Sequence, residues 1–330
     1  MTVTEKIINK AKAAQKTIVL PEGSEPRTLI AAAKVLADSI ARPVLLGDPV
    51  LIEKTAADLG ADIKGARVID PVDKESAGYY AESLFRLRES KGLSREEAAK
   101  LILDPMYYAV MMVKCGDADG MVSGAVHTTG QMLRPALQII KTKPGINCVS
   151  SSFIMELPDK TYGEDGVLIY ADCVVIPDPT DEELAHIAVT TADTARTLCD
   201  FKEPRVAMLS FSTMGSARHE SADKVRRAVQ IARRLSPQLC LDGEMQFDAA
   251  IVPEIGALKA PGSSVAGRAN ILIFPDLQSG NIGYKITQRL GKADAFAVLQ
   301  GLARPCNDLS RGCSSDDIVK TIAITAVQAG

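Results

Sequence analysis

The sequence predicts an α/β fold built on largely parallel sheets. Short apolar runs of strand length recur along the chain, each bounded by Gly, Pro or polar residues. The segments between these runs carry helical apolar spacing and helix-start signals. Because long helical crossovers join parallel strands, we expect the functional loops at the carboxyl ends of the strands. The predicted strands are Thr17–Leu20, Pro43–Leu46, Gly120–Val122, Val149–Ile154, Val206–Leu209, Ile271–Phe274 and Phe296–Leu299.

The predicted helices follow from local signals between these strands. Residues 1–16 form a short amphipathic pattern whose lysines interrupt any signal-peptide core. Ser94–Glu97 and Thr180–Glu183 are capping-box patterns, and each opens an apolar-periodic stretch. An apolar helix is predicted over Ile318–Val327. The alternation of strand and helix therefore extends along the whole chain.

Length and composition predict a folded protein with two domains or one large one. The 330 residues are about twice a typical domain. The helical pattern breaks at Lys141–Gly145, and a second crossing between domains is expected near Leu302–Pro305. A hydrophobic fraction of 46% with 24% charged residues excludes disorder, collagen and coiled coil. The net charge of −3 gives no positive field for nucleic acid, and no apolar run approaches a membrane span. We expect a cytoplasmic protein.

The cysteines and histidines indicate neither a disulfide framework nor a metal site. The seven cysteines are an odd number without a C-x-x-C pair, and most lie in apolar runs. The three histidines lack the spacing of zinc ligands. Cys313 alone, in a polar turn, invites a functional interpretation. No metal is therefore expected.

Three clusters rich in Gly, Ser and Thr lie beside predicted strands, at residues 123–130, 210–216 and 261–268. A loop that opens a helix can hold an anion with its N–H groups, and phosphate is the obvious candidate. Arg134 and Arg226 lie in the helices that follow the first two clusters. Ordinary turn chemistry explains any single cluster better, and the three together favour a phosphate-like ligand modestly. The chain has no nucleotide P-loop, dinucleotide fingerprint or serine nucleophile elbow.

The segment Gly301–Asp317 is crowded with reactive groups. Arg311 can bind phosphate oxygens through its planar guanidinium, and Ser310 can donate a hydrogen bond. Asp317 lies one turn inside the last predicted helix. Its spacing from Ser314 favours a helix cap over a catalytic role when the residues are considered alone.

At this segment the sequence resembles the phosphate acetyltransferase family in its short, single-module form. The resemblance runs along nearly the whole chain, and it is carried by Gly301–Asp317, Asp276–Asn281, Gln288–Gly291, Leu20–Arg27, Asp117–Gly124 and Leu241–Ala250. It implies the reversible reaction of acetyl phosphate with coenzyme A to give acetyl-CoA and phosphate, through a ternary complex. Coenzyme A would be a substrate, and neither a permanently bound cofactor nor an acyl-enzyme is implied.

The resemblance also implies roles for matching residues. Asp317 matches the base that removes the thiol proton, although a slip of one position would give that role to Asp316. Ser310 matches a serine that assists the thiol or the transition state, and Arg311 matches an arginine that binds phosphoryl or carbonyl oxygens. The implied substrate-binding residues are Arg88 (for coenzyme A), Arg134, Arg289, Thr129, Gly130 and Cys313. Cys313 would lie near the site without acting as a nucleophile.

The fold implied by the resemblance has two α/β domains with the active site in a cleft between them, as in isocitrate and isopropylmalate dehydrogenases. Domain I would comprise residues 1–146 plus 301–330, including the returning C-terminal helix, and domain II residues 147–300. A homodimer is also implied, with no nucleic-acid or membrane partner.

Three other functions stay open at this point. A phosphate butyryltransferase would run the same chemistry with a larger acyl pocket, but the match over Gly301–Asp317 favours acetyl. A metal- and nicotinamide-dependent dehydrogenase of the related fold would need several metal-binding aspartates and an adenosine site. A catalytically silent acyl-phosphate-binding module would need no acid at position 317, so Asp317 beside Ser310 and Arg311 argues against it.

Overall fold

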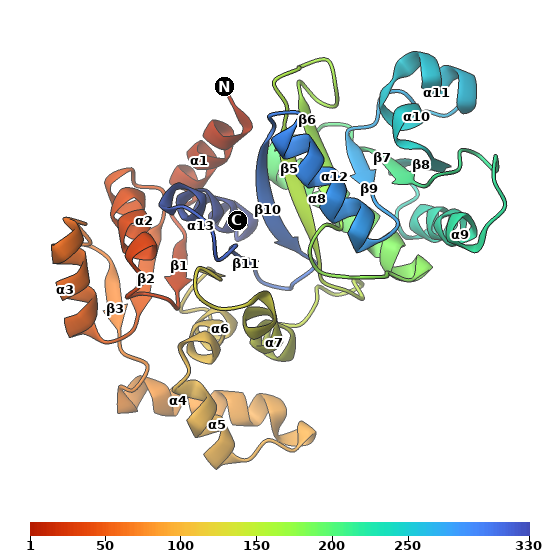
Figure 1. Ribbon diagram of the computed structural model, residues 1–330. Helices are drawn as coiled ribbons and strands as arrows, with labels where there is room; N and C mark the ends of the chain where they lie inside the picture. The colour runs from red at the N-terminus through yellow and green to blue at the C-terminus, as the bar shows by residue number, and fades with distance from the viewer. The chain divides into compact units, whose positions relative to one another are not determined.

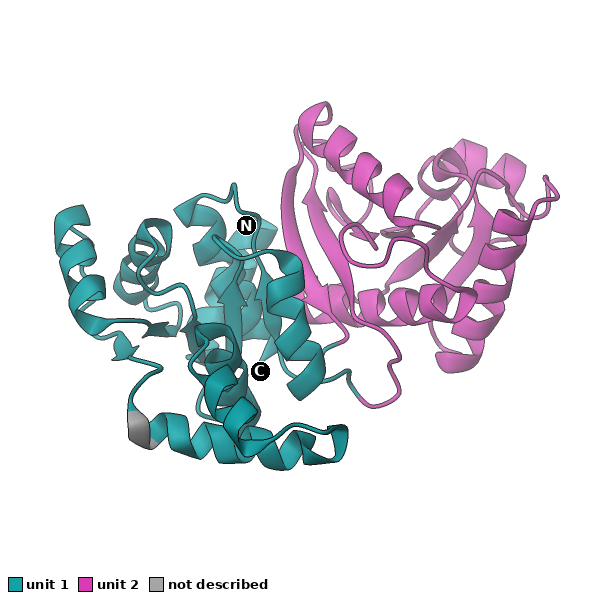
Figure 2. Ribbon diagram, turned by 60° about the horizontal axis from the view of Figure 1, so that its bottom comes forward, with its two compact units in different colours: residues 1–143, 302–330 teal, residues 144–301 magenta. Residues whose placement is uncertain are grey.

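The strands form two separate sheets, one in each of two units of the chain (Figure 2). Unit 1 comprises residues 1–143 and 302–330, and unit 2 comprises residues 144–301. The computed structural model describes residues 1–330 apart from the side chains of Lys74 and Glu75. The α/β class predicted from the sequence is confirmed. The chain passes between units three residues earlier than the predicted 146/147 boundary and returns one residue later than predicted, because a bridge between Thr142 and Leu302 ties both connecting segments to unit 1.

The sheet of unit 1 is parallel throughout. Its strand order is β11-β4-β1-β2-β3, so strands far apart in the sequence are neighbours. The carboxyl ends of all five strands therefore lie along one edge of the sheet. The strands are β1 (Thr17–Leu20), β2 (Arg42–Leu46), β3 (Arg67–Ile69), β4 (Gly120–Ser123) and β11 (Cys306–Asp308).

The last helix of the chain belongs to unit 1. It packs against α1, α2 and the strands β1, β4 and β11 (Figure 1). Capping boxes open α1, α5, α7 and α13, as a Ser or Thr with an acid or amide three residues later predicts. The helices of unit 1 are α1 (Val3–Ala14), α2 (Pro26–Ala37), α3 (Pro49–Leu59), α4 (Lys74–Arg88), α5 (Arg95–Ile102), α6 (Pro105–Cys115), α7 (Thr129–Ile139) and α13 (Ser315–Gln328), with a 3₁₀ turn at Glu89–Lys91.

The sheet of unit 2 is mixed. Its order is β10-β5-β6-β9-β7-β8, and β5 runs antiparallel to both of its neighbours. The prediction of largely parallel pairing therefore holds for β6, β9, β7 and β8. The strands are β5 (Ser150–Glu156), β6 (Val167–Ala171), β7 (Arg205–Leu209), β8 (Cys240–Met245), β9 (Ile271–Ile273) and β10 (Asp294–Gln300), and the helices are α8 (Asp181–Cys199), α9 (Glu220–Leu235), α10 (Phe247–Ile251), α11 (Pro253–Lys259) and α12 (Leu277–Arg289).

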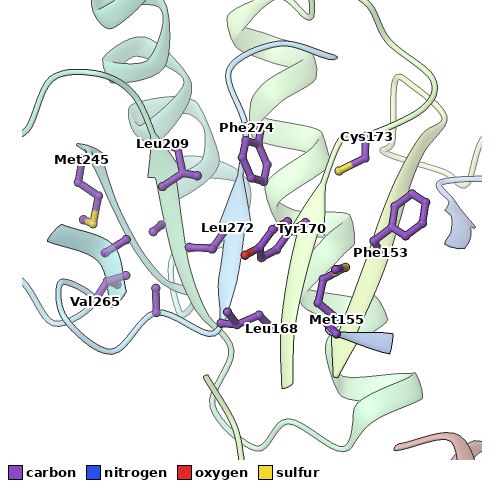
Figure 3. Close-up of a cluster of buried hydrophobic side chains, with 14 residues drawn as sticks. Phe153, Met155, Leu168, Tyr170, Cys173, Leu209, Met245, Val265, Leu272 and Phe274 are labelled. Atoms are coloured by element: carbon purple, nitrogen blue, oxygen red, sulfur yellow. The ribbon is translucent and has the colours of Figure 1, made fainter. Parts of the chain in front are cut away.

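A hydrophobic core lies on the sheet of unit 2. Leu168 and Tyr170 of β6 lie beside Leu272 of β9 and the following Phe274 (Figure 3). The rings of Tyr170 and Phe274 are 5.2 Å apart and tilted, a favourable arrangement for aromatic pairs. Across the part of the chain that the structure describes, no helix is both long enough and apolar enough to cross a bilayer.

Candidate active site

Three neighbouring strands of unit 1 deliver most of the predicted site residues to one edge of the sheet. Ser310 follows β11, Thr129 follows β4, and a glutamate missed by the sequence analysis, Glu22, follows β1. The strands are adjacent in the order β11-β4-β1 and parallel, so the three loops gather. The candidate active site is therefore built on segments that are close in the fold and distant in the sequence.

The Glu22 carboxylate accepts several hydrogen bonds at this edge of the sheet. Its side chain is buried, with 7% of the residue exposed. The backbone N–H groups of Gly124 and Ala125 donate to its Oε2 over 3.1 and 2.9 Å. Those of Val126 and His127 donate to its Oε1 over 3.0 and 2.9 Å, and Nδ1 of His127 lies 2.8 Å from the same oxygen. One carboxylate thus fixes the loop that leads from β4 to α7.

The hydrogen bonds to Glu22 outweigh the cost of its burial. Burial alone would raise the pKa of this carboxyl, but the backbone and side-chain hydrogen bonds from His127, with those from Val126 and Ala125, hold the pKa below its ordinary value. The N–H groups of residues 124–127 are therefore committed to an internal anion. The expectation that these groups cradle phosphate is corrected: the loop binds an anion, and that anion is Glu22.

The cluster at 210–216 in unit 2 follows the same principle. Glu244 is buried, and its Oε1 accepts hydrogen bonds from the Ser212 hydroxyl and from the N–H of Gly215, over 2.8 and 2.9 Å. Arg226 donates to the same oxygen over 2.9 Å. This loop and its arginine also bind an internal carboxylate, so the cluster does not add to the case for a phosphate-like ligand that the three clusters made together.

The third cluster, at 261–268, shows ordinary turn chemistry. The Ser263 hydroxyl accepts hydrogen bonds from the N–H groups of Val265 and Ala266, each over 3.2 Å. The loop, including its last residue Arg268, lines a pocket of about 370 Å³. Its geometry agrees with the explanation that the sequence favoured for a single cluster.

Arg27, at the start of α2, braces the segment after β11. Its guanidinium donates to the carbonyl oxygens of Arg311 and Cys313 over 2.8 and 3.0 Å, and to that of Ala125 over 2.9 Å. Its Nε pairs with Glu25 over 2.7 Å. One side chain thus joins the β1, β4 and β11 loops. Arg27 lies in a segment that carried the family resemblance, but its own role was not predicted.

The turn after β11 presents Ser310 and Arg311 on the surface. Both residues are exposed. The Ser310 hydroxyl accepts a hydrogen bond from the N–H of Gly312 over 3.3 Å, and the Ser310 carbonyl accepts one from the N–H of Cys313 over 2.9 Å. Within the described residues the Arg311 guanidinium has no ion pair or hydrogen bond, so its donors can serve a ligand.

The helix cap predicted at Asp317 is present. Its Oδ2 accepts hydrogen bonds from the N–H and the hydroxyl of Ser314 over 2.9 and 2.8 Å. Asp317 is exposed, and among the described residues its Oδ1 has no hydrogen-bond partner. The neighbouring Asp316 pairs with Lys34 over 2.8 Å, and this hydrogen bond lowers the pKa of Asp316. Asp317 therefore has one carboxylate oxygen available to a ligand, whereas the carboxylate of Asp316 is paired with Lys34 of α2.

Asp308, the last residue of β11, is a second carboxyl that the sequence analysis missed. The Thr129 hydroxyl donates to its Oδ2. Burial, together with the negative charge of Glu22, raises the pKa of Asp308 to about 6. The predicted substrate residue Thr129 thus lies in direct contact with a perturbed carboxyl. Gly130, the next residue of α7, is exposed.

Cys313 lies beneath the turn and is not a surface thiol. The residue is buried, and its Sγ lies 3.8 Å from a guanidinium nitrogen of Arg27. Burial raises the pKa of this thiol, against the opposing charge of Arg27. A thiol that stays neutral near pH 7 is a poor nucleophile. Across the described residues, no group of three or more His, Cys, Asp and Glu side chains is placed to hold a metal ion.

The remaining predicted arginines belong to the helices α4, α7 and α12. Arg134 is exposed on α7, and it has no hydrogen bond among the described residues. Arg88 donates to the carbonyl of Gln138 over 3.1 Å, near the far end of the same helix. Arg289 is exposed at the end of α12 in unit 2. The convergence of Arg289 with the arginines of unit 1 stays a prediction.

Comparison with known proteins gives a consistent picture. The family model described as phosphate acetyl/butaryl transferase matches residues 2–326. The chain is 57% identical over 330 residues to a phosphate acetyltransferase of Thermoanaerobacterium thermosaccharolyticum, covering 100% of both proteins. It is 55% identical to a phosphate acetyltransferase of Clostridium acetobutylicum, covering 100% of this chain and 99% of that protein. The crystal structure of a phosphotransacetylase from Streptococcus pyogenes matches with a TM-score of 0.94 at 46% identity, covering 100% and 99% of the two chains.

Proposed function

The chain belongs to the phosphate acetyl/butaryl transferase family, and from this premise we propose that it transfers an acetyl group reversibly between acetyl phosphate and coenzyme A. The observation that carries the proposal is the surface turn at Ser310 and Arg311, with Asp317 at the start of the next helix. It supplies an unpaired guanidinium and a carboxylate oxygen without a partner among the described residues. Those are the groups that a thiol nucleophile and an anionic leaving group require.

In the proposed mechanism Asp317 is the base. Its Oδ1 takes the proton of the coenzyme A thiol as the sulfur attacks the carbonyl carbon of acetyl phosphate. The new C–S bond forms, the C–O bond to the phosphoryl group breaks, and phosphate leaves with the electron pair of that bond. Ser310 stabilises the thiolate or the developing negative charge by a hydrogen bond. The reverse reaction follows the same path, with phosphate as the nucleophile.

Arginines would hold the phosphate through this reaction. Arg311 and Arg134 are exposed and unpaired among the described residues, so binding an anion breaks no ion pair. A planar guanidinium matches two phosphate oxygens at once. Arg289 completes the set in our proposal when unit 2 brings α12 to the same ligand. Cys313 lines this region as a neutral thiol, and Gly130 beside Thr129 leaves room for the anion.

Arg88 is proposed to bind coenzyme A at a distance from the reacting sulfur. It contacts Gln138 of α7, nine residues beyond Thr129. Nine residues of α-helix span about 14 Å. An extended ligand such as coenzyme A can reach from the reacting turn to a charged group at this distance. The proposal therefore places the thiol of coenzyme A near Thr129 and another part of the same molecule near Arg88.

The direct test is a comparison of acyl phosphates. The purified protein should form acetyl-CoA from acetyl phosphate and coenzyme A, also in the presence of a metal chelator. Propionyl and butyryl phosphate, assayed in parallel, should give lower kcat/KM values. A preference for butyryl phosphate would instead assign the chain to the butyryl branch of the family, and failure with every acyl phosphate would overturn the proposal.

Replacing Arg311 with Ala should lower kcat/KM for acetyl phosphate by about 100-fold, as expected when a preorganised donor to developing charge is lost. Steady-state kinetics with acetyl phosphate varied at saturating coenzyme A would measure this. Arg304→Ala is a matched control, because Arg304 is also an exposed arginine of the same segment. Equal kinetics for the two variants would remove Arg311 from the anion site.

Replacing Arg27 with Ala should lower kcat by about 10- to 100-fold, because the turn at Ser310 would lose the brace that fixes its position. Arg27→Lys should be nearly as impaired, since an ammonium group cannot reproduce the planar fork of donors. Arg86→Ala is the control, because Arg86 is exposed and among the described residues it pairs only with Glu82. Wild-type turnover in Arg27→Ala would show that the turn needs no brace.

Assembly and location complete the proposal. We propose a homodimer located in the cytoplasm. Ile282, Ile286 and Leu290 are exposed at helical spacing along α12 and its C-cap, and a second copy of the chain would cover this apolar face. Light scattering of the purified protein measures the mass directly, and a mass of one chain would exclude the dimer.

A further inference from the structure

We propose that Asp308 is a positioning residue for the nucleophile: it holds the Thr129 hydroxyl so that the oxygen of Thr129 accepts a hydrogen bond from the nucleophile as it binds, before the proton passes to Asp317. This inference rests on the proposed function. The nucleophile that carries a proton is the thiol of coenzyme A in one direction and hydrogen phosphate in the other. The shared chemistry is therefore a hydrogen-bond donor that must be oriented for attack.

The contact that carries this inference joins two loops of the site. Thr129 is the first residue of α7, is only partly buried, and donates through its hydroxyl to Oδ2 of Asp308. Asp308 ends β11, two residues before Ser310. The Thr129 hydroxyl therefore contacts a carboxyl that lies two positions before Ser310 in the chain.

Asp308 is closely packed against the β4 loop. Its Oδ1 is buried and has no hydrogen-bond partner among the described residues. Gly124 of the β4 loop passes so close that a Cβ there would lie 2.5 Å from this oxygen and 2.7 Å from the Leu309 nitrogen. A glycine with φ of +116° makes this approach possible. The close approach of Gly124 thus limits the space into which the carboxyl can turn away from Thr129.

The direction of the hydrogen bond fixes what Thr129 can recognise. A carboxylate has no proton, so above pH 6 the hydroxyl proton of Thr129 is used by Asp308. The oxygen of Thr129 then has only lone pairs to offer to a ligand. It cannot donate to the acyl phosphate, and it can accept from S–H or from the O–H of hydrogen phosphate. Since each is the nucleophile of its own direction, one acceptor serves both.

Burial and the charges around Asp308 set how this arrangement responds to pH. Burial raises the pKa of Asp308 most, Glu22 of the β1 loop raises it further, and His127 of the β4 loop is bound to Glu22 in turn. On α7 the neighbour is the neutral Thr129. Once protonated, Asp308 can donate to Thr129 and reverse the hydrogen bond. Activity should therefore fall as pH falls through about 6.

The test is a double-mutant cycle assayed in both directions. Thr129→Val and Asp308→Ala should each lower kcat/KM by about 10- to 100-fold for coenzyme A in one direction and for phosphate in the other. The double variant should be no worse than Thr129→Val alone, because the two residues act as one unit. Thr129→Ser, which keeps the hydroxyl, should restore most of the activity. Asp308→Asn should lose the decline near pH 6.

A binding measurement separates this inference from the proposed function. Calorimetric titration with coenzyme A and with its desulfo analogue should show that the wild type prefers the thiol and that Thr129→Val does not. Thr161→Val is the matched control, because Thr161 also donates to an aspartate, Asp159, at an exposed site.

The outcomes are distinct. An inactive wild type that still distinguishes the two ligands would overturn the proposed function alone. Additive losses in the double variant, a Ser variant as impaired as the Val variant, or equal ligand preference in wild type and Thr129→Val would overturn the role of Asp308. Thermal unfolding of each variant separates misfolding from loss of the hydrogen bond.

Discussion

Replacing Asp317 with Asn should lower turnover by about 100-fold or more, with little change in the KM of either substrate, as for the loss of a general base. The structure makes this substitution informative. The side-chain oxygen of Asn can still accept the Ser314 hydrogen bonds that Oδ2 accepts in the native protein. The start of α13 is therefore retained while the proton acceptor is lost. Single-turnover kinetics would separate this chemical step from product release.

The control for Asp317 is its neighbour. Asp316→Asn removes an exposed pair with Lys34, which contributes little to stability, so turnover should change less than twofold. If instead Asp316→Asn were the inactive variant, the one-position slip considered for the sequence match would be real. If both variants kept full activity, the base would have to be another group.

Replacing Glu22 with Ala should cost about 3 kcal/mol or more of unfolding free energy, because several buried or partly buried N–H groups lose their acceptor at once. Urea denaturation followed by circular dichroism would measure the loss. Glu22→Gln keeps one carbonyl oxygen but turns an amide toward N–H donors, so it should be destabilised by a smaller amount. It also provides a folded variant if Glu22→Ala does not fold.

The matched control for Glu22 is Glu97, an exposed glutamate that accepts a hydrogen bond from the N–H of Ser94. Glu97→Ala should cost about 1 kcal/mol or less. Similar losses in the two variants would contradict the central role assigned to Glu22.

Acid should weaken the protein through the same residue. The hydrogen bonds of Glu22 hold its folded pKa below the ordinary value of 4.5, so its contribution is fully present above about pH 4.5 and is lost as pH falls through the folded pKa. The urea midpoint of the native protein should therefore fall with acidification below pH 4.5. Glu22→Gln should show a shallower decline.

Sequence patterns predicted the elements whose signal is local. The apolar run at 17–20 coincides with β1, and the capping box at Thr180 opens α8, because both depend on residues near each other in the chain. β11 was missed because Cys306, Asn307 and Asp308 have no apolar pattern, and their strand conformation comes from pairing with β4. The strands β3, β6 and β8 were also missed. β8 contains Asp242 and Glu244, which interrupt its apolar pattern. β6 is followed by a further apolar stretch, so the sequence does not show where the strand ends.

The candidate site divides in the same way. Ser310, Arg311 and Asp317 could be named from the sequence because they share one short segment that also carries the family resemblance, and their roles stay predictions. Glu22 receives its hydrogen bonds from residues 102 to 105 positions away, and Arg27 reaches residues more than 280 positions away. The residues next to Glu22 and Arg27 in the sequence give no sign of these distant partners. The supporting residues therefore required the fold, whereas the residues proposed to react could be named from the sequence.

The discontinuity of unit 1 has a consequence for biosynthesis. The segment 144–301 is contiguous and carries a complete sheet, so on the ribosome it can fold as soon as it emerges. Residues 1–143 emerge earlier but must wait for β11 and α13, which are translated after the whole of unit 2. Nascent chains should thus pass through a stage in which unit 2 is folded and unit 1 still lacks β11 and α13. The candidate active site is therefore incomplete until β11 and α13 have been translated.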